Sequence, residues 1–192
     1  MDYTSERFKR LYDVISTDDF LSMKSLGGEI PFFIFAYDAQ YELFVQKSVR
    51  QLKNKLETSG VTVCEINLYD IVIDILEEEL GMDEVFGIEK DMDKEEFKDA
   101  LQSVLEIHEV LMPKIKTLID ESDAKVNFLT NIGLVFPYIR SHTILNNLQN
   151  VAKQSPTITF FPGKYDGHSL NLFGLLKDDN YYRAFNIDKI KV

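Results

Sequence analysis

Residues 30–38 read IPFFIFAYD, a continuous apolar run that ends at an acidic residue. A short run of this kind is typical of a strand that is buried on both faces of a sheet. Three later runs have the same character: VTVCEINL (61–68), KVNFLT (125–130) and TITFF (157–161). We therefore predict that these four runs form the centre of a single sheet.

The segments between these runs have the spacing of helices. In Gln40–Thr58 the apolar residues Leu43, Phe44, Val49, Leu52 and Leu56 fall on one side. Further helices are predicted over Ile71–Leu80, Lys94–Ile107, Val110–Asp120 and Pro137–Asn150. Gly81–Asp93 reads as a linker, His168–Leu176 as a short helix or turn, and Tyr181–Ile187 as a fifth, edge strand.

The alternation of strands and helices favours parallel pairing with right-handed crossovers. The predicted fold is an α/β, three-layer fold with a mostly parallel sheet of about five strands flanked by helices, either Rossmann-like or a degenerate P-loop-like fold. A chain of 192 residues suits one domain, 1–192. Within it we expect an N-terminal helical segment (1–28), with two short helices in Tyr3–Lys24 before a turn at Leu26–Glu29, and an acidic helical insertion (81–123).

Charge is distributed unevenly along the chain. The net charge is −11, but residues 1–123 contain 13 basic and 28 acidic residues, a net charge of −15, and the remainder carries +4. The window 74–109 alone has 14 acidic residues and 3 lysines. Such a surface repels nucleic-acid phosphates, so direct DNA binding is the weakest of the functions considered, although the basic C-terminal third leaves it open. The window fits a solvated helical face, or else an acidic docking surface for a basic partner.

Cysteine content and apolar runs indicate the compartment. One cysteine, Cys64, cannot form an internal disulfide, and its place in a predicted strand favours core packing. No apolar run approaches the roughly 18–20 residues that cross a bilayer, and the first residues lack the apolar core of a signal peptide. We expect a reducing, cytoplasmic location.

Polar residues stand at the predicted strand ends, where ligands gather in open parallel sheets. Asp38 and Asp70 each follow a strand and precede a helix. Two such aspartates can hold a metal ion or act as an acid–base pair, but Asp is also a favoured helix N-cap. An alternative function follows from this edge: a small nucleotide- or metal-binding enzyme or sensor that uses Asp38, Asp70, Asn131, Arg140 and Asp166.

A second group of polar and aromatic residues lies in the C-terminal third. His142 and Asn146 share a helix face, and Tyr and Arg are the residue types that protein interfaces favour at hot spots. Structural roles are open for the same residues: the asparagines can satisfy loop carbonyls, and Tyr181 and Tyr182 can alternate across an edge strand. The candidate partner-binding residues are Arg140, His142, Asn146, Asn147, Lys164, Tyr165, Asp166, Lys177, Asp178, Asp179, Asn180, Tyr181, Tyr182 and Arg183.

Recognised catalytic motifs are missing from the sequence. It has no Gly-x-Ser-x-Gly elbow and no Walker A loop, and its three histidines are far apart, without the spacing of a zinc site. We therefore expect a non-catalytic protein, with no cofactor and no bound metal.

Several blocks resemble one known family. FLTNIGLVFPYIRSHTILNNLQ and PTITFFPGKYDGHSLNLFGLLKDDNYYRAF, with PFFIFAYD and EINLYD upstream, are similar to the BrxB family of bacterial BREX phage-defence systems, over roughly Pro31 to Phe185. The resemblance implies an accessory or scaffolding component of a cytoplasmic antiphage assembly. Its companions there are the alkaline-phosphatase-like protein PglZ, a large AAA+ ATPase and a DNA methyltransferase, and PglZ is the partner we expect. The family supplies no catalytic residues to transfer.

Overall fold

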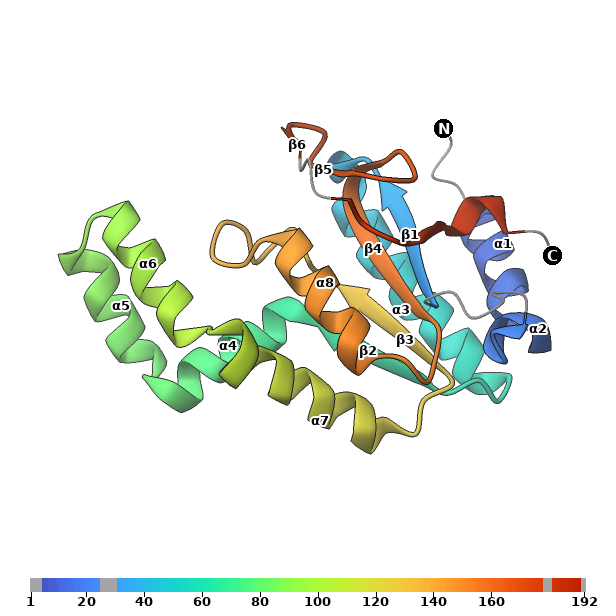
Figure 1. The fold of residues 1–192 in the computed structure, drawn as a ribbon, viewed down its shortest axis with the longest axis horizontal. Coiled ribbons are helices and arrows are strands. Elements are labelled where there is room, and N and C mark those ends of the chain that lie inside the picture. The colour runs from blue at the N-terminus through green and yellow to red at the C-terminus, as the bar shows by residue number, and fades with distance from the viewer. Residues whose placement is uncertain (1–4, 25–30, 178–180, 191–192) are drawn as a thin grey trace.

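The fold is built on a parallel sheet with the strand order β2-β3-β4-β1-β7. The structure is a computed structural model that describes residues 5–24, 31–177 and 181–190 (Figure 1). The five strands are β1 (Phe32–Tyr37), β2 (Val63–Asn67), β3 (Val126–Thr130), β4 (Thr157–Tyr165) and β7 (Phe185–Asn186). Every neighbouring pair along this path is parallel. The predicted α/β fold with a mostly parallel, helix-flanked sheet is confirmed.

Strands with apolar side chains on both faces produce two hydrophobic cores. Along β1, Phe32 and Ile34 point to one face of the sheet, and Phe33 and Phe35 point to the other, because successive side chains of a strand alternate. On the first face the core is completed by α4 (Leu68–Glu79), α7 (Met112–Ser122) and α8 (Ser141–Val151). On the second it is completed by α1 (Ser5–Ile15), α2 (Asp18–Leu21) and α3 (Glu42–Thr58), which gives three layers (Figure 1).

Helix α3 follows the predicted range but buries a shorter stripe. Val49, Leu52 and Leu56 are in the core, as the spacing predicts. The prediction is wrong for Leu43, which is 82% exposed, and for Phe44, which is 42% exposed. A short 3₁₀ turn, η2 (Ala39–Tyr41), precedes α3 and sets the start of its buried stripe at Val45.

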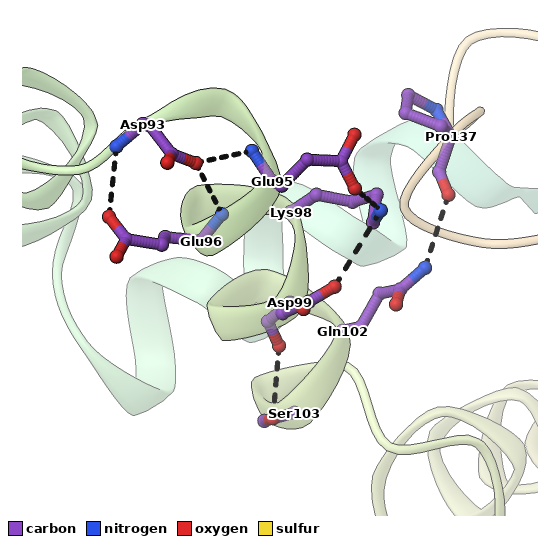
Figure 2. Close-up of polar contacts among 8 residues, drawn as sticks. All are labelled: Asp93, Glu95, Glu96, Lys98, Asp99, Gln102, Ser103 and Pro137. Carbon is purple, nitrogen blue, oxygen red and sulfur yellow. Dashed lines mark hydrogen bonds and ion pairs between the residues drawn. The ribbon is translucent and has the colours of Figure 1, made fainter.

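The region predicted as a linker, Gly81–Asp93, forms a helix instead. Helix α5 (Met82–Asp91) starts after Gly81, and α6 (Lys94–Val104) follows it, so that the two form a helical arm beside the sheet (Figure 1). A capping box starts α6: the Asp93 carboxylate accepts from the backbone N–H groups of Glu95 and Glu96, and Glu96 accepts from the Asp93 N–H (Figure 2). Helix α5 was not predicted because its sequence contains a glycine and several acidic residues. Only Val85 of this helix is fully buried, so it has no apolar stripe of helical spacing.

Two other helices begin later than predicted. Helix α7 starts at Met112, after the π-helical segment η3 (Ile107–Leu111), and carries Pro113 in its first turn, where proline is tolerated. Helix α8 starts at Ser141, whereas we expected it from Pro137. Residues 132–138 form turns instead and connect β3 to α8, with a cis peptide bond before Pro137.

The predicted helix or turn at His168–Leu176 is a hairpin of strands. Strand β4 continues past Pro162 to Tyr165, and β5 (Leu170–Leu172) and β6 (Leu176–Lys177) pair antiparallel beside it. Gly163 makes this pairing possible, because a Cβ atom there would lie 2.1 Å from the backbone oxygen of Asn171. Of the predicted edge strand Tyr181–Ile187, only Phe185 and Asn186 pair with β1. The predicted turn at Leu26–Glu29 lies outside the described residues.

The two ends of the described chain are joined by a polar clasp. The Arg7 guanidinium donates from Nε to Asp188 Oδ1 (3.0 Å) and from Nη2 to Asp188 Oδ2 (2.6 Å). It also donates to the Ala36 backbone oxygen (2.7 Å) and lies 3.8 Å from the centroid of the Phe35 ring. Asp188 belongs to the short helix η4 (Ile187–Lys189), so α1 and the end of the chain are held against β1. Among the described residues, no helix has the length and apolar character that crossing a membrane requires.

Candidate functional site

The carboxyl ends of β1, β2 and β3 meet at one edge of the sheet, as predicted. Beneath the first half of α3 they enclose a cavity of about 90 Å³, which we call the strand-end pocket. Its polar lining comes from Tyr37, Glu42, Gln46, Arg50, Glu65, Asn67, Thr130 and Asn131. This volume admits a few water molecules, and the cavity opens at the position where parallel α/β sheets bind ligands.

The polar side chains of the strand-end pocket hydrogen-bond to one another. The Tyr37 hydroxyl donates to Glu42 Oε2 (2.7 Å). Gln46 Nε2 lies 3.1 Å from Glu42 Oε1 and 3.0 Å from Asn131 Oδ1, and it donates to both. Asn131 Nδ2 in turn donates to Asn67 Oδ1 (2.7 Å). The network therefore links α3 with the ends of β1, β2 and β3.

Two members of this network have unusual properties. Burial raises the pKa of the Tyr37 hydroxyl above its ordinary value, and the neighbouring Glu42 carboxylate raises it further, so Tyr37 acts here as a neutral donor. Asn131 has a φ of 59°, in the left-handed region that asparagine tolerates better than most residues. That conformation lets its amide face both Gln46 and Asn67.

Of the two aspartates singled out at the strand ends, one is an N-cap. Asp38 Oδ1 accepts from the Gln40 backbone N–H (3.1 Å) and caps η2. Asp70 is not the cap that the sequence suggested. The cap of α4 is Asn67, whose side chain accepts from the Asp70 N–H (3.4 Å) and donates to Asp70 Oδ2 (2.5 Å). The difference arises because α4 begins directly at the end of β2, three residues earlier than predicted.

A larger hollow lies on the other face of the sheet, between α6 and the start of α8. This α6–α8 cleft has a volume of about 740 Å³ and brings together three predicted residues that are distant in sequence: Arg140, His142 and Lys177. One wall of the cleft is α6, whose Gln102 side chain donates to the Pro137 backbone oxygen (3.3 Å) and ties the helix to the β3–α8 connection (Figure 2).

The other predicted residues of α8 do not line this cleft. Asn147 Nδ2 donates to the Thr143 backbone oxygen within the same helix (2.8 Å), which gives it a local structural role. Asn146 is exposed to solvent. A partner contact through Asn146 stays a prediction.

Residues of the β4–β5 turn serve mainly to shape it. The Tyr165 hydroxyl donates to the Ala184 backbone oxygen (2.7 Å), and its pKa is raised by burial. The Asp166 carboxylate accepts from the backbone N–H groups of Ser169 and His168, each at 2.8 Å. These bonds lower the pKa of Asp166 to about 2. Lys164 is exposed on β4 beside this turn.

The tyrosine pair near the C-terminus alternates between core and solvent. Tyr182 is 2% exposed and belongs to the core, whereas Tyr181 is 65% exposed and its ring lies 5.8 Å from that of His168. Arg183 is exposed, and its backbone oxygen accepts from Gln149 Nε2 (3.1 Å). The remaining predicted residues, Asp178, Asp179 and Asn180, lie outside the described part of the chain.

A group of exposed apolar side chains that was not predicted from the sequence lies beside the cleft. Phe136 and Phe173, each 37% exposed, meet edge to face with ring centroids 6.3 Å apart. Leu134 (47%), Leu175 (83%) and Leu176 (41%) are exposed around them. We call these five residues the apolar rim. The pattern LFGLL in residues 172–176 was a signal for it, since an apolar run beside a glycine turn can point outward as well as inward.

Cys64, the one thiol of the sequence, lines neither cavity. Cys64 is buried in β2, and burial raises the pKa of its thiol. Across the residues that the structure describes, no three His, Cys, Asp or Glu side chains form a group suited to holding a metal ion.

Comparison with known proteins gives a clear family assignment. A family model described as BREX protein BrxB matches residues 64–187. The chain belongs to the BrxB family. A curated BREX protein BrxB of Bacillus cereus (strain H3081.97) is 38% identical over 190 residues, which cover 96% of this chain and 98% of that relative. A second, of Escherichia coli O9:H4 (strain HS), is 32% identical over 181 residues, which cover 94% of this chain and 90% of the relative. No solved structure matched significantly.

Membership of the BrxB family makes this chain a component of a BREX defence system, as the resemblance implied. The range that matches the BrxB family model contains all residues that line the α6–α8 cleft. It contains only part of the strand-end pocket, because Tyr37, Glu42 and Gln46 precede residue 64.

Proposed function

We propose that this BrxB-family protein is a non-catalytic scaffolding component of a BREX antiphage complex and acts by binding other BREX proteins, PglZ first among them. The apolar rim carries this proposal. Five large apolar side chains, each between 37% and 83% exposed, lie on the connections that follow β3 and β5 and on the first residue of β6. Exposed apolar clusters of this kind mark protein–protein contact sites, because covering them removes apolar surface from water.

The polar groups at the sheet edge support a structural role over a catalytic one. In the strand-end pocket the carboxylate of Glu42 and the amides of Gln46, Asn67 and Asn131 bond to each other. A general base or nucleophile needs a partner arranged to activate it and a position within reach of substrate. Tyr37 and Glu42 are bonded within the network, and Cys64 is buried in a strand.

The experiment is co-expression of a tagged form of this protein with the BREX proteins encoded beside it, followed by affinity purification at physiological salt. We expect PglZ to be retained in a defined ratio through gel filtration. If the tagged protein retains no BREX component, the proposed function is wrong.

The strand-end pocket suggests a second candidate function, a sensor for a small ligand. Its small cavity opens where α/β proteins bind nucleotides. The five residues first considered for such a site do not converge, because Asn131 and Arg140 line different cavities and Asp166 caps a turn. A ligand that binds only the folded state must raise its stability. If no nucleotide or divalent ion raises the melting temperature of the protein, this second function is wrong.

A further inference from the structure

The α6–α8 cleft offers a binding site with an apolar floor. Phe161, Leu170 and Leu172 belong to the core of the sheet and its hairpin, and they also line the cleft. Its volume, about 740 Å³, is within the range of roughly 300–1,000 Å³ that is common for ligand sites. The cleft is therefore large enough for at least one large apolar side chain, and Phe136 and Leu176, 37% and 41% exposed, supply the apolar surface for it.

One end of the cleft is built to receive a negative charge. Arg140 stands at the N-cap of α8 and makes no side-chain capping bond there, so the helix N-terminus faces the cleft without a side-chain cap. The Ser141 hydroxyl oxygen is buried but has no hydrogen-bond partner within the described chain. Lys177 lines the same cleft from β6. Backbone N–H groups at a helix start, a guanidinium and an ammonium together favour an anion such as a carboxylate.

The acidic residues of the opposite wall oppose this preference only weakly. Glu95 and Asp99 line the cleft, but Lys98 lies between them and pairs with both (Figure 2). The remaining carboxylates at the start of α6, those of Asp93 and Glu96, are engaged in the capping box. Arg140 stands at the start of α8, opposite the α6 wall that carries Glu95 and Asp99.

The apolar rim favours a segment of a protein over a free small molecule as the ligand of the cleft. Phe136 and Leu176 line the cleft and also belong to the rim, which extends the apolar surface beyond the cleft through Leu175, 83% exposed. A small acid bound in the cleft would leave that outer surface in water. A protein segment would cover the floor and the rim together.

We propose that the α6–α8 cleft binds a segment of a partner protein that presents a large apolar side chain next to a carboxylate. The apolar side chain lies against Phe136 and Leu176, and the carboxylate pairs with Arg140 at the start of α8. This inference rests on the proposed function, because it names the surface and the chemistry through which the scaffold would hold a BREX partner.

Quantitative co-purification with the neighbouring BREX proteins tests the inference. Arg140→Glu reverses the charge at the anion end, and Leu176→Asp places a charge on the apolar wall. Both side chains are exposed, so the variants should melt like wild type. Each should weaken retention of the partner at least about tenfold, as expected for a contact at the centre of an interface. Matched controls on α3, Lys47→Glu and Leu43→Asp, change exposed residues far from the cleft and should retain the partner as wild type does.

The possible outcomes separate the inference from the proposed function. If wild type retains a partner and both cleft variants retain it equally, the cleft assignment is wrong and the scaffolding function stands. If wild type retains no BREX protein, both are wrong. A third arm, Asp99→Lys, checks the sign of the charge. Loss of the partner in this variant, with normal retention by Arg140→Glu, would show that the partner presents a cation and would overturn the stated chemistry.

Discussion

Replacing Arg7 with alanine should destabilise the protein more than any exposed ion pair can explain. Arg7 makes two hydrogen bonds to the Asp188 carboxylate and one to the Ala36 backbone oxygen, and its guanidinium covers the Phe35 ring. The side chains of Arg7 and Asp188 are only 11% and 25% exposed, so solvent screens their attraction weakly. The substitution leaves a half-buried carboxylate without this partner.

The expected magnitude follows from these contacts. Removing one member of a buried pair costs about 3–5 kcal/mol, and the partial exposure of Asp188 places this pair near the lower end, about 3 kcal/mol. A chain of this size loses roughly 2–4 °C of melting temperature per kcal/mol, so we expect a fall of about 6–12 °C. The assay is thermal and urea unfolding of Arg7→Ala, Asp188→Ala and the double variant, in which the two losses should couple by about 1–2 kcal/mol.

A surface pair provides the control. Lys116 and Asp120 are 55% and 54% exposed on α7, and Lys116→Ala should change the free energy of unfolding by less than about 0.5 kcal/mol. The reasoning fails if Arg7→Ala is no more destabilising than Lys116→Ala. It also fails if the Arg7 and Asp188 substitutions add without coupling, because the two side chains would then not act as a pair.

Three further predictions concern single residues. Gly163→Ala should lower the free energy of unfolding by about 1–3 kcal/mol, since the new Cβ would meet the Asn171 backbone oxygen. The control Gly87→Ala, on α5 with open space around it, should be neutral or stabilising, and calorimetry of both variants measures the difference. The buried Cys64 thiol, with its raised pKa, should react with a thiol reagent such as Ellman's reagent only when the protein is unfolded, and fast labelling of the native protein would contradict its placement. The pKa of Asp166 is lowered from 3.8 to about 2, so its carboxylate stabilises the fold above pH about 4, and this contribution is lost as the pH falls through about 2. Asp166→Asn should therefore flatten the dependence of the free energy of unfolding on pH across that window. An unchanged slope would contradict the assignment.

The sheet could be predicted from the sequence because its strands are buried on both faces. The runs FFIFAY, VCEIN, VNFLT and TITFF have few polar residues, and a buried parallel strand needs that composition. The meeting of Tyr37, Asn67 and Asn131 at one edge followed from the topology alone, since parallel strands end on the same side.

What the sequence did not show depends on contacts between distant segments. The β5–β6 hairpin has strands of three and two residues, too short for a periodic pattern, and it exists because Gly163 lets Asn171 approach. Helix α5 buries little, so its apolar spacing was weak. The α6–α8 cleft could not be predicted for the same reason. Its walls come from α6, the β3–α8 connection and the hairpin, and the last two were predicted as other structures.

The order of the strands has a consequence for synthesis of the chain. Among the described strands, β1 pairs with β4 and β7 alone, both from the C-terminal third. About 120 residues must therefore be made after Tyr37 before its first partner at Thr157 exists. At about 5–20 residues per second the ribosome needs roughly 6–24 s for this interval. During that time FFIFAY, six uncharged residues of high β propensity, has the composition of a segment that pairs with other chains. We therefore expect a chain truncated before residue 157 to aggregate more readily than the full chain, because β1 would lack its β4 partner.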